Sequence, residues 1–123
     1  MLDKNKETVE KVNKVIRENN LEEFLSFYTD DVQWTKVGDK AATGKEELGK
    51  LIESLGDAPP PSRITFDAMI AEGDYVAAYG KLVVEDENGK PISQAFCDVY
   101  LFRGDKIAEL TAFVMKTEAT NKA

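Results

Sequence analysis

The sequence predicts an α+β domain in which three N-terminal helices pack on one face of a curved antiparallel sheet. In the first half of the chain, apolar residues recur at three- and four-residue spacing, which is typical of amphipathic helices. From Arg63 onward, alternating runs are separated by turns that contain Gly, which is typical of strands joined as hairpins. Helices followed by a run of strands indicate an α+β domain rather than an alternating parallel fold.

Three helices are expected before the strands. The first spans residues 4–19, the second follows directly, and the third begins after Thr43 and ends near Gly56. Thr43 and Glu46 have the spacing of a capping box, in which each side chain bonds the backbone of the other. A short strand, residues 31–37, is expected between the second and third helices.

The remaining strands are expected at residues 64–71, 75–85 and 91–116, the last being a hairpin that turns at Gly104–Asp105. Residues 58–62 contain three prolines and are expected to be an extended connector, since proline disrupts both helices and central strands. Because 123 residues suit one core, residues 1–123 are expected to form a single domain.

The first strand of that hairpin is apolar on both faces. Alternate residues point to opposite faces, so one face carries Phe96, Asp98, Tyr100 and Phe102, and the other carries Ala95, Cys97, Val99 and Leu101. A strand covered on both sides needs helices on one side and a second cover on the other. A second copy of the chain is a candidate for that cover.

Composition and charge exclude several function classes. The formal net charge of -7 disfavours nucleic acid and anionic membranes as partners. No apolar run approaches the roughly 20 residues of a membrane span, and the N-terminus has no apolar signal core, so we expect a cytoplasmic protein. The chain has no histidine and one cysteine, and it has neither a phosphate-binding Gly loop nor a calcium loop. We therefore expect no metal and no cofactor.

Asp98 is the candidate functional acid, because it lies inside an apolar strand pattern. A lone buried aspartate has a raised pKa, stays protonated and donates a hydrogen bond. The alternative is a structural role, as the ion-pair partner of Lys36 or in a bond to a tyrosine hydroxyl. Lys36 in turn is either a second catalytic group or a lysine whose amine extends to water.

The candidate ligand-binding residues are aromatic or apolar side chains near this acid: Tyr28, Trp34, Tyr79, Phe96, Tyr100, Phe102 and Val114. Tyrosine hydroxyls orient ligands, while a tryptophan forms either a stacking wall or plain core. The face on which Tyr79 lies is open, because residues 77–82 show no clear alternation and are compatible with a bulge.

Three motifs, residues 27–34 (FYTDDVQW), 43–48 (TGKEEL) and 102–107 (FRGDKI), together with the element order, resemble the nuclear-transport-factor-2-like superfamily. The resemblance is to its SnoaL-like branch, which includes polyketide cyclases and ketosteroid isomerases, and it covers roughly Glu7 to Lys116. It implies a cone-shaped, cystatin-like fold around a mostly apolar pocket, and a homodimer through the outer sheet face. Many activities share this fold.

The resemblance carries over only part of the isomerase site. The position of the family's base is Lys36 here, and the position of its tyrosine donor falls near Val12. Its second aspartate, a protonated donor, aligns with Asp98. Three function classes therefore remain: a lyase, isomerase or cyclase using Asp98 as acid with Lys36; a non-catalytic protein that binds a small, largely apolar molecule; and a dimeric interaction domain.

Overall fold

The computed structural model describes residues 2–18, 20–54 and 63–117. In chain order its elements are α1 (Leu2–Arg17), α2 (Leu21–Leu25), β1 (Tyr28–Lys36), β2 (Lys40–Thr43), α3 (Lys45–Ser54), β3 (Arg63–Glu72), β4 (Tyr75–Glu85), β5 (Pro91–Arg103) and β6 (Lys106–Lys116). The expected connector at residues 58–62 lies outside the described residues. The predicted α+β class and order of elements are confirmed, with β2 added between the first strand and the third helix.

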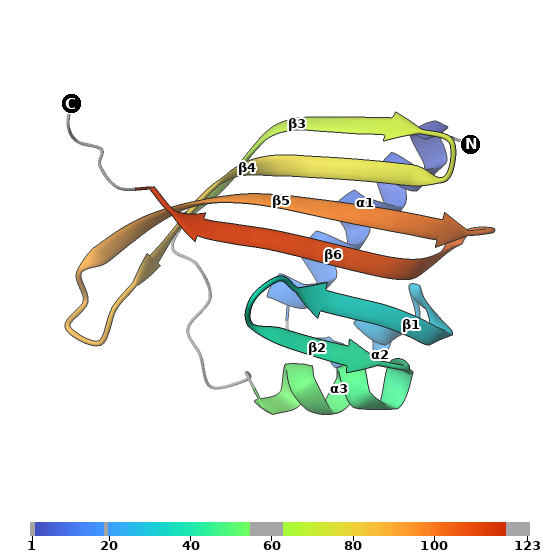
Figure 1. Cartoon of the computed structure of the whole chain (residues 1–123), viewed down its shortest axis with the longest axis horizontal. Helices are drawn as coiled ribbons and strands as arrows, with labels where there is room; N and C mark the ends of the chain where they lie inside the picture. The colour runs from blue at the N-terminus through green and yellow to red at the C-terminus, as the bar shows by residue number, and fades with distance from the viewer. Residues whose placement is uncertain (1, 19, 55–62, 118–123) are drawn as a thin grey trace.

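The six strands form one sheet in the order β2-β1-β6-β5-β4-β3 (Figure 1). Strands β3 to β6 are the expected antiparallel meander. The sheet as a whole is mixed, because β1 runs parallel to β6. This pairing brings the N-terminal third of the chain next to the C-terminal hairpin, so that residues far apart in the sequence share one sheet face.

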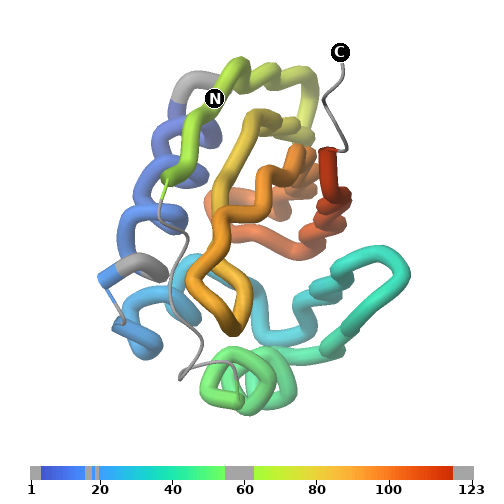
Figure 2. Tube along the Cα trace, turned by 90° about the vertical axis from the view of Figure 1, so that its left-hand side faces the viewer, coloured from blue at the N-terminus to red at the C-terminus, as the bar shows by residue number. Residues whose placement is uncertain are grey.

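Helix α1 covers one face of the sheet, where it contacts β3 and β4 (Figures 1 and 2). We call this the inner face; it carries Asp98, because Tyr100, two residues further along β5, accepts a bond from Asn13 of α1. Helix α3 packs on β1 and β2 at the other end of the sheet. The core lies between helices and sheet, and its buried side chains come from both: Val9, Val12, Phe24, Tyr28, Val32, Leu48, Val76, Tyr100, Phe102, Ile107 and Leu110. The apolar side chains of α1 and those on the inner face of β5 therefore pack into one core.

The N-terminus of α3 departs from the predicted capping box. The backbone N–H of Thr43 donates to Oε1 of Glu47 over 2.8 Å, so the carboxylate that closes this end comes from Glu47 and not from Glu46. The helix begins one residue later than predicted, since the N–H of Leu48 donates to the carbonyl of Gly44. The Thr43 hydroxyl donates to Gln33 on the neighbouring strand.

A bulge in β3 explains why one position on the neighbouring strand β4 must be a glycine. The pairing of β3 with β4 shifts register between Phe66 and Ala68. A Cβ atom on Gly80, across from the bulge, would overlap the carbonyl oxygen of Thr65. Only glycine allows the two backbones to approach so closely. The missing side chain also leaves room for the rings of Phe66 and Phe96, whose centroids are 5.4 Å apart in an edge-to-face arrangement.

Candidate functional site

Asp98 lies in the middle of the inner face of β5. Its cross-strand neighbours are Ala78 on β4 and Ala112 on β6. Both neighbours share its face of the sheet, because directly paired residues do. Both alanines are themselves buried, at 0% and 8% exposed, so the cross-strand neighbours of the acid are small, covered apolar side chains.

The Asp98 carboxyl group is desolvated and unpaired. Burial raises its pKa from the ordinary 3.8 to about 6. Among the described residues, none donates a hydrogen bond to Asp98 or forms an ion pair with it. In the same part of the chain, every fully buried side-chain oxygen has a hydrogen-bond partner, so the unpaired oxygens of Asp98 are not fully buried. The carboxyl oxygens therefore retain access to solvent while most of the group is shielded. A carboxyl in this state is protonated at mildly acidic pH and donates a hydrogen bond.

Two tyrosine hydroxyls are electrostatically coupled to Asp98. Tyr28 at the start of β1 is 1% exposed, and Tyr100 on β5 is 2% exposed. Burial raises the pKa of both hydroxyls, and the charge of Asp98 raises each further. Both tyrosines therefore remain protonated at physiological pH and act as hydrogen-bonding hydroxyls, not as bases.

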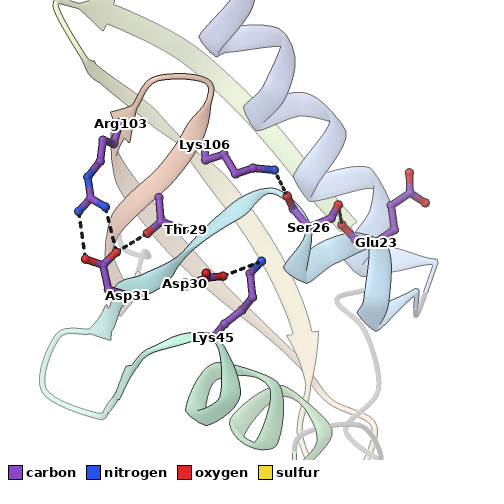
Figure 3. A network of polar contacts seen from close by, with 8 residues as sticks. All are labelled: Glu23, Ser26, Thr29, Asp30, Asp31, Lys45, Arg103 and Lys106. Atoms are coloured by element: carbon purple, nitrogen blue, oxygen red, sulfur yellow. Dashed lines mark hydrogen bonds and ion pairs between the residues drawn. The ribbon is translucent and has the colours of Figure 1, made fainter.

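Residues that precede and follow Tyr28 in the chain are bonded to the β5–β6 hairpin (Figure 3). Lys106 Nζ donates to the carbonyl of Ser26 over 2.8 Å. On the other side, Arg103 donates two bonds to the Asp31 carboxylate, at 3.1 and 3.3 Å. Since Arg103 and Lys106 flank the β5–β6 turn, this turn fixes the position of a tyrosine that is far away in the sequence.

Asn13 on α1 joins the same cluster, which comprises Asp98, Tyr28, Tyr100 and Asn13 and is called the Asp98 cluster below. Its amide nitrogen Nδ2 lies 3.4 Å from the Tyr100 hydroxyl oxygen and 2.9 Å from the carbonyl oxygen of Val9. Sequence reasoning missed Asn13. The available signal was its position within the apolar stripe of the first helix, four residues after Val9.

The apolar residues of the predicted set lie on the inner face, with one exception. Phe96 and Phe102 are buried, Trp34 packs against the core opposite Leu110, and Val114 is half-buried opposite Phe96. These positions place an aromatic and aliphatic surface around the Asp98 cluster. Phe66, which contacts Phe96, belongs to the same surface but was not predicted.

The exception is Tyr79, which the structure places on the outer face. It is 43% exposed and is paired with Cys97, whereas its neighbour Ala78 is buried and paired with Asp98. The inclusion of Tyr79 among the ligand-binding residues is therefore wrong, and its face, which the sequence left open, is the outer one. Alternation along β4 is regular, because the bulge that was suspected near Tyr79 lies in the adjacent strand β3.

Lys36 is not the ion-pair partner of Asp98. Its Nζ lies 3.4 Å from Oδ2 of Asp39, across the turn between β1 and β2. Lys36 is paired with Ala112, and so is Asp98 from the other side, which puts the two residues two strands apart. The half-exposed amine extends toward the turn, as the alternative interpretation of this lysine expected.

The profile of the SnoaL-like domain family matches residues 9–110. The chain belongs to the SnoaL-like family. The match includes the second half of α1, all of β1 to β5 and the four residues of the Asp98 cluster. The resemblance inferred from the sequence motifs is thereby confirmed. A search of the curated proteins finds no match.

Solved structures show that this SnoaL-like chain has the nuclear-transport-factor-2-like fold. A protein of that fold and of unknown function from Burkholderia pseudomallei is 20% identical, with a TM-score of 0.79 over 89% of this chain and 88% of that one. An M. tuberculosis epoxide hydrolase of the LEH-like type is 12% identical, with a TM-score of 0.78 over 93% and 84%. TerC, co-crystallised with polyporic acid, is 19% identical, with a TM-score of 0.76 over 89% of each chain.

The described residues of this SnoaL-like domain contain neither a membrane-spanning helix nor a cluster of metal ligands. Within residues 2–18, 20–54 and 63–117, no helix is long and apolar enough to cross a membrane. In the same ranges, no group of three acidic or cysteine side chains is arranged to hold a metal ion.

Proposed function

We propose that this SnoaL-like protein binds a small, largely apolar molecule on the inner face of its sheet, with the protonated Asp98 carboxyl donating a hydrogen bond to the ligand. The single observation that carries the proposal is a desolvated carboxyl with no partner among the described residues. A buried polar group without a partner costs free energy, and a ligand that completes its hydrogen bond recovers that free energy.

The surroundings of Asp98 favour an apolar ligand. Phe96, Phe66 and Trp34 supply aromatic surface on the face of the sheet that carries Asp98. Small-molecule sites are typically apolar with few polar groups that fix orientation. TerC, a structural neighbour, crystallises with polyporic acid, which supports the choice of an apolar ligand that carries oxygen atoms.

Asp98 is also the group through which lyase, isomerase or cyclase chemistry would proceed. A neutral carboxyl that donates to a carbonyl oxygen stabilises the negative charge that develops there when a neighbouring proton is removed. Lys36, held by Asp39, is not positioned by any contact with Asp98. Binding is therefore the function that the geometry supports best, and catalysis would require a base from the substrate, from water or from a rearranged Lys36.

The test uses two probes that differ only in the polar group, 2-acetylnaphthalene and 2-ethylnaphthalene. Binding is followed by chemical shift changes of backbone amides between pH 5.5 and 8. We expect the ketone to bind about five- to tenfold more tightly at pH 5.5, as one hydrogen bond provides. Because the pKa of Asp98 is about 6, this advantage declines as the pH rises above 6.

Two substitutions make the test specific. Asp98→Asn keeps a hydrogen-bond donor that does not titrate, so the preference for the ketone persists across the pH range. Asp98→Leu removes the donor and the preference together. Equal binding of the two probes at pH 5.5, or binding of neither, contradicts the proposal.

We further propose that the protein assembles as a homodimer through the outer face of the sheet. This face carries five exposed large apolar side chains: Ile70, Tyr75, Tyr79, Phe113 and Met115, which are 40% to 62% exposed. Contiguous exposed apolar surface of this kind is typical of interaction sites. Val99 and Leu101 on the central strand β5 lie on the same face. A second copy of the chain is the partner that the resemblance to this family implies.

A further inference from the structure

Hydrogen bonds of Asp86 close the turn between β4 and β5. Its backbone N–H donates to the carbonyl of Lys90 over 2.9 Å, and its carbonyl accepts the N–H of Gly89 over 3.0 Å. Its carboxylate oxygen Oδ1 accepts two more backbone N–H groups, from Asn88 at 2.8 Å and from Lys90 at 2.9 Å. We call these four bonds the Asp86 network; they hold the tip of the hairpin that Figure 1 shows at its lower left.

The turn requires a glycine directly after Asn88. Gly89 has a φ angle of +80°, a backbone conformation that glycine adopts without the steric cost that it has for other residues. Three-residue hairpin loops that end in such a residue are common. Beyond its chain neighbours, no atom lies within 4 Å of a Cβ built on Gly89, so this side of the turn is open space.

The side chain of Asn88 takes no part in closing the turn. The residue is exposed, and within the part of the chain that the structure describes, only its backbone N–H is hydrogen-bonded, to Asp86. Asn88 is also the asparagine of this sequence that precedes a glycine. Its side-chain carbon Cγ can therefore approach the backbone nitrogen of Gly89 once the turn opens, with no side chain on Gly89 to hinder the approach.

An asparagine followed by glycine can react with its own backbone. When the glycine nitrogen loses its proton to solvent base and attacks Cγ, a cyclic succinimide forms and the side-chain nitrogen leaves as ammonia. A water molecule then opens the ring at either carbonyl, which gives isoaspartate or aspartate. The net reaction converts an amide and water into a carboxylate and ammonium, so it needs no oxidant, reductant or enzyme.

We propose that Asn88 is a site of spontaneous modification to isoaspartate and aspartate, and that the Asp86 network sets the rate of this reaction. While the turn is closed, the N–H of Gly89 is bound to the Asp86 carbonyl and its nitrogen does not attack. The reaction therefore proceeds from the opened turn, which the two bonds of the Asp86 carboxylate keep rare. Exposed hairpin tips open locally at a small cost in free energy.

The modification changes the end of the hairpin and leaves the inner face intact. Isoaspartate adds a carbon atom to the backbone, so the Asp86 network cannot close as before. The strand pair next to the turn, Glu85 with Pro91, loses its protection first, whereas the pair of Ala78 with Asp98 lies far along the hairpin. The modified chain also carries one more negative charge than the -7 of the unmodified chain.

The test incubates the full-length chain at pH 8 and follows each asparagine by peptide mapping with mass spectrometry. We expect conversion at Asn88 to be faster than at Asn13 or Asn20, and slower at pH 5.5, because the Gly89 nitrogen must lose its proton. Asp86→Ala removes the two bonds of the carboxylate and should accelerate the conversion about fivefold to tenfold, as the net loss of one hydrogen bond allows. In urea, where the turn is open in both proteins, their rates should agree.

Three control variants separate the hydrogen bonds from the charge of the turn. Asp86→Asn keeps an acceptor oxygen without the charge, and Glu87→Gln removes a charge that has no hydrogen bond among the described residues; both should convert at nearly the wild-type rate. Asn88→Gln should abolish the reaction, because its longer side chain closes a less favourable ring. Acceleration by Asp86→Asn and Glu87→Gln to the level of Asp86→Ala would overturn the role of the network.

Hydrogen exchange measures the opening of the turn without any variant. The protection of the Gly89 N–H in the wild-type chain should match the ratio of the conversion rates in urea and in buffer, because both report the same opened state. Conversion at Asn88 that is no faster than at Asn13, or a conversion rate that Asp86→Ala leaves unchanged, overturns the inference.

Discussion

At the scale of single residues, the protonation of Asp98 is set by what surrounds it and not by its own chemistry. Asp31, in contrast, is an exposed aspartate whose pKa is lowered by its bonds to Arg103 and Thr29. Burial without a cation shifts Asp98 in the opposite direction. The same residue type therefore serves as a structural anion at one position and as a candidate acid at another.

The raised pKa of Asp98 predicts that this residue destabilises the fold at neutral and alkaline pH. With a pKa near 3.8 when unfolded and about 6 when folded, its stabilising contribution is complete below pH 3.8 and is lost as the pH rises through 6. Asp98→Asn, which resembles the protonated form, should be more stable than the wild type by about 3 kcal/mol at pH 8, and the difference should fall to about 0.5 kcal/mol at pH 4. Urea unfolding at both pH values measures it.

A constant difference across this pH range would contradict the raised pKa. Asp74→Asn is the matched control, because Asp74 lies in the exposed turn between β3 and β4. Its substitution is expected to leave the pH dependence of the unfolding free energy close to that of the wild type.

The second residue-scale prediction concerns Gly80. Gly80→Ala places a Cβ against the Thr65 carbonyl oxygen, which belongs to the backbone and cannot rotate away. We expect a loss of about 3 kcal/mol or more in unfolding free energy, at the upper end of overpacking effects. Gly49→Ala is the control, since its Cβ would lie 3.2 Å from the Leu25 Cδ1 atom, the end of a flexible side chain. Its unfolding free energy should stay within about 1 kcal/mol of the wild type.

At the scale of elements, the N-terminus of α3 illustrates how spacing alone misassigns a cap. Two glutamates follow Thr43 at adjacent positions, Glu46 and Glu47. The capping-box pattern selects the first. The helix begins one residue later than that pattern requires, so the second carboxylate faces the free N–H of Thr43 and Glu46 is directed toward Lys50, 3.9 Å away.

These two glutamates provide a matched pair for a test of the cap. Glu47→Ala removes the acceptor of the Thr43 N–H and should cost about 1 kcal/mol of unfolding free energy. Glu46→Ala removes an exposed ion pair with Lys50, one helical turn away, and should cost about 0.3 kcal/mol of unfolding free energy. Thermal unfolding at pH 7 measures both variants. A larger loss from Glu46→Ala than from Glu47→Ala would indicate that Glu46, as the spacing predicts, caps the N-terminus of α3.

At the scale of the whole molecule, the sheet has two apolar faces but the described helices cover one of them. The inner face is covered by α1, whereas Ile70 and Met115 on the outer face are 60% and 62% exposed. Antiparallel sheets commonly leave one face in water, but that face is then polar. The proposed homodimer provides the missing cover.

The proposed homodimer predicts a mass in solution of twice the 13.7 kDa chain mass. Val99→Arg or Leu101→Arg places a charge at the centre of the outer face, and burying that charge without a partner is costly. We expect these variants to elute with the mass of one chain in size-exclusion chromatography with light scattering. Asn88→Arg adds the same charge at the exposed β4–β5 turn and should keep the wild-type mass. A wild-type protein with the mass of one chain would contradict the interface.

Several features were determined by the sequence alone, because they depend on neighbours along the chain. Helical spacing identified the apolar stripe of α1, and alternation placed Phe96, Asp98 and Tyr100 on one face of β5. The three family motifs identified the fold. In each case the information lies within a few residues, where the geometry of a helix or strand fixes which side chains share a face.

Other features were decided only by the tertiary structure, because they join residues that no local spacing relates. The parallel pairing of β1 with β6 places Tyr28 beside the hairpin, and the packing of α1 brings Asn13 to Tyr100, 87 residues away. Alternation in β4 could not be judged until the bulge was located in β3, so the face of Tyr79 stayed open and its inclusion among the ligand-binding residues was wrong. Spacing determines the faces of an element, but the contacts between faces depend on how the whole chain packs.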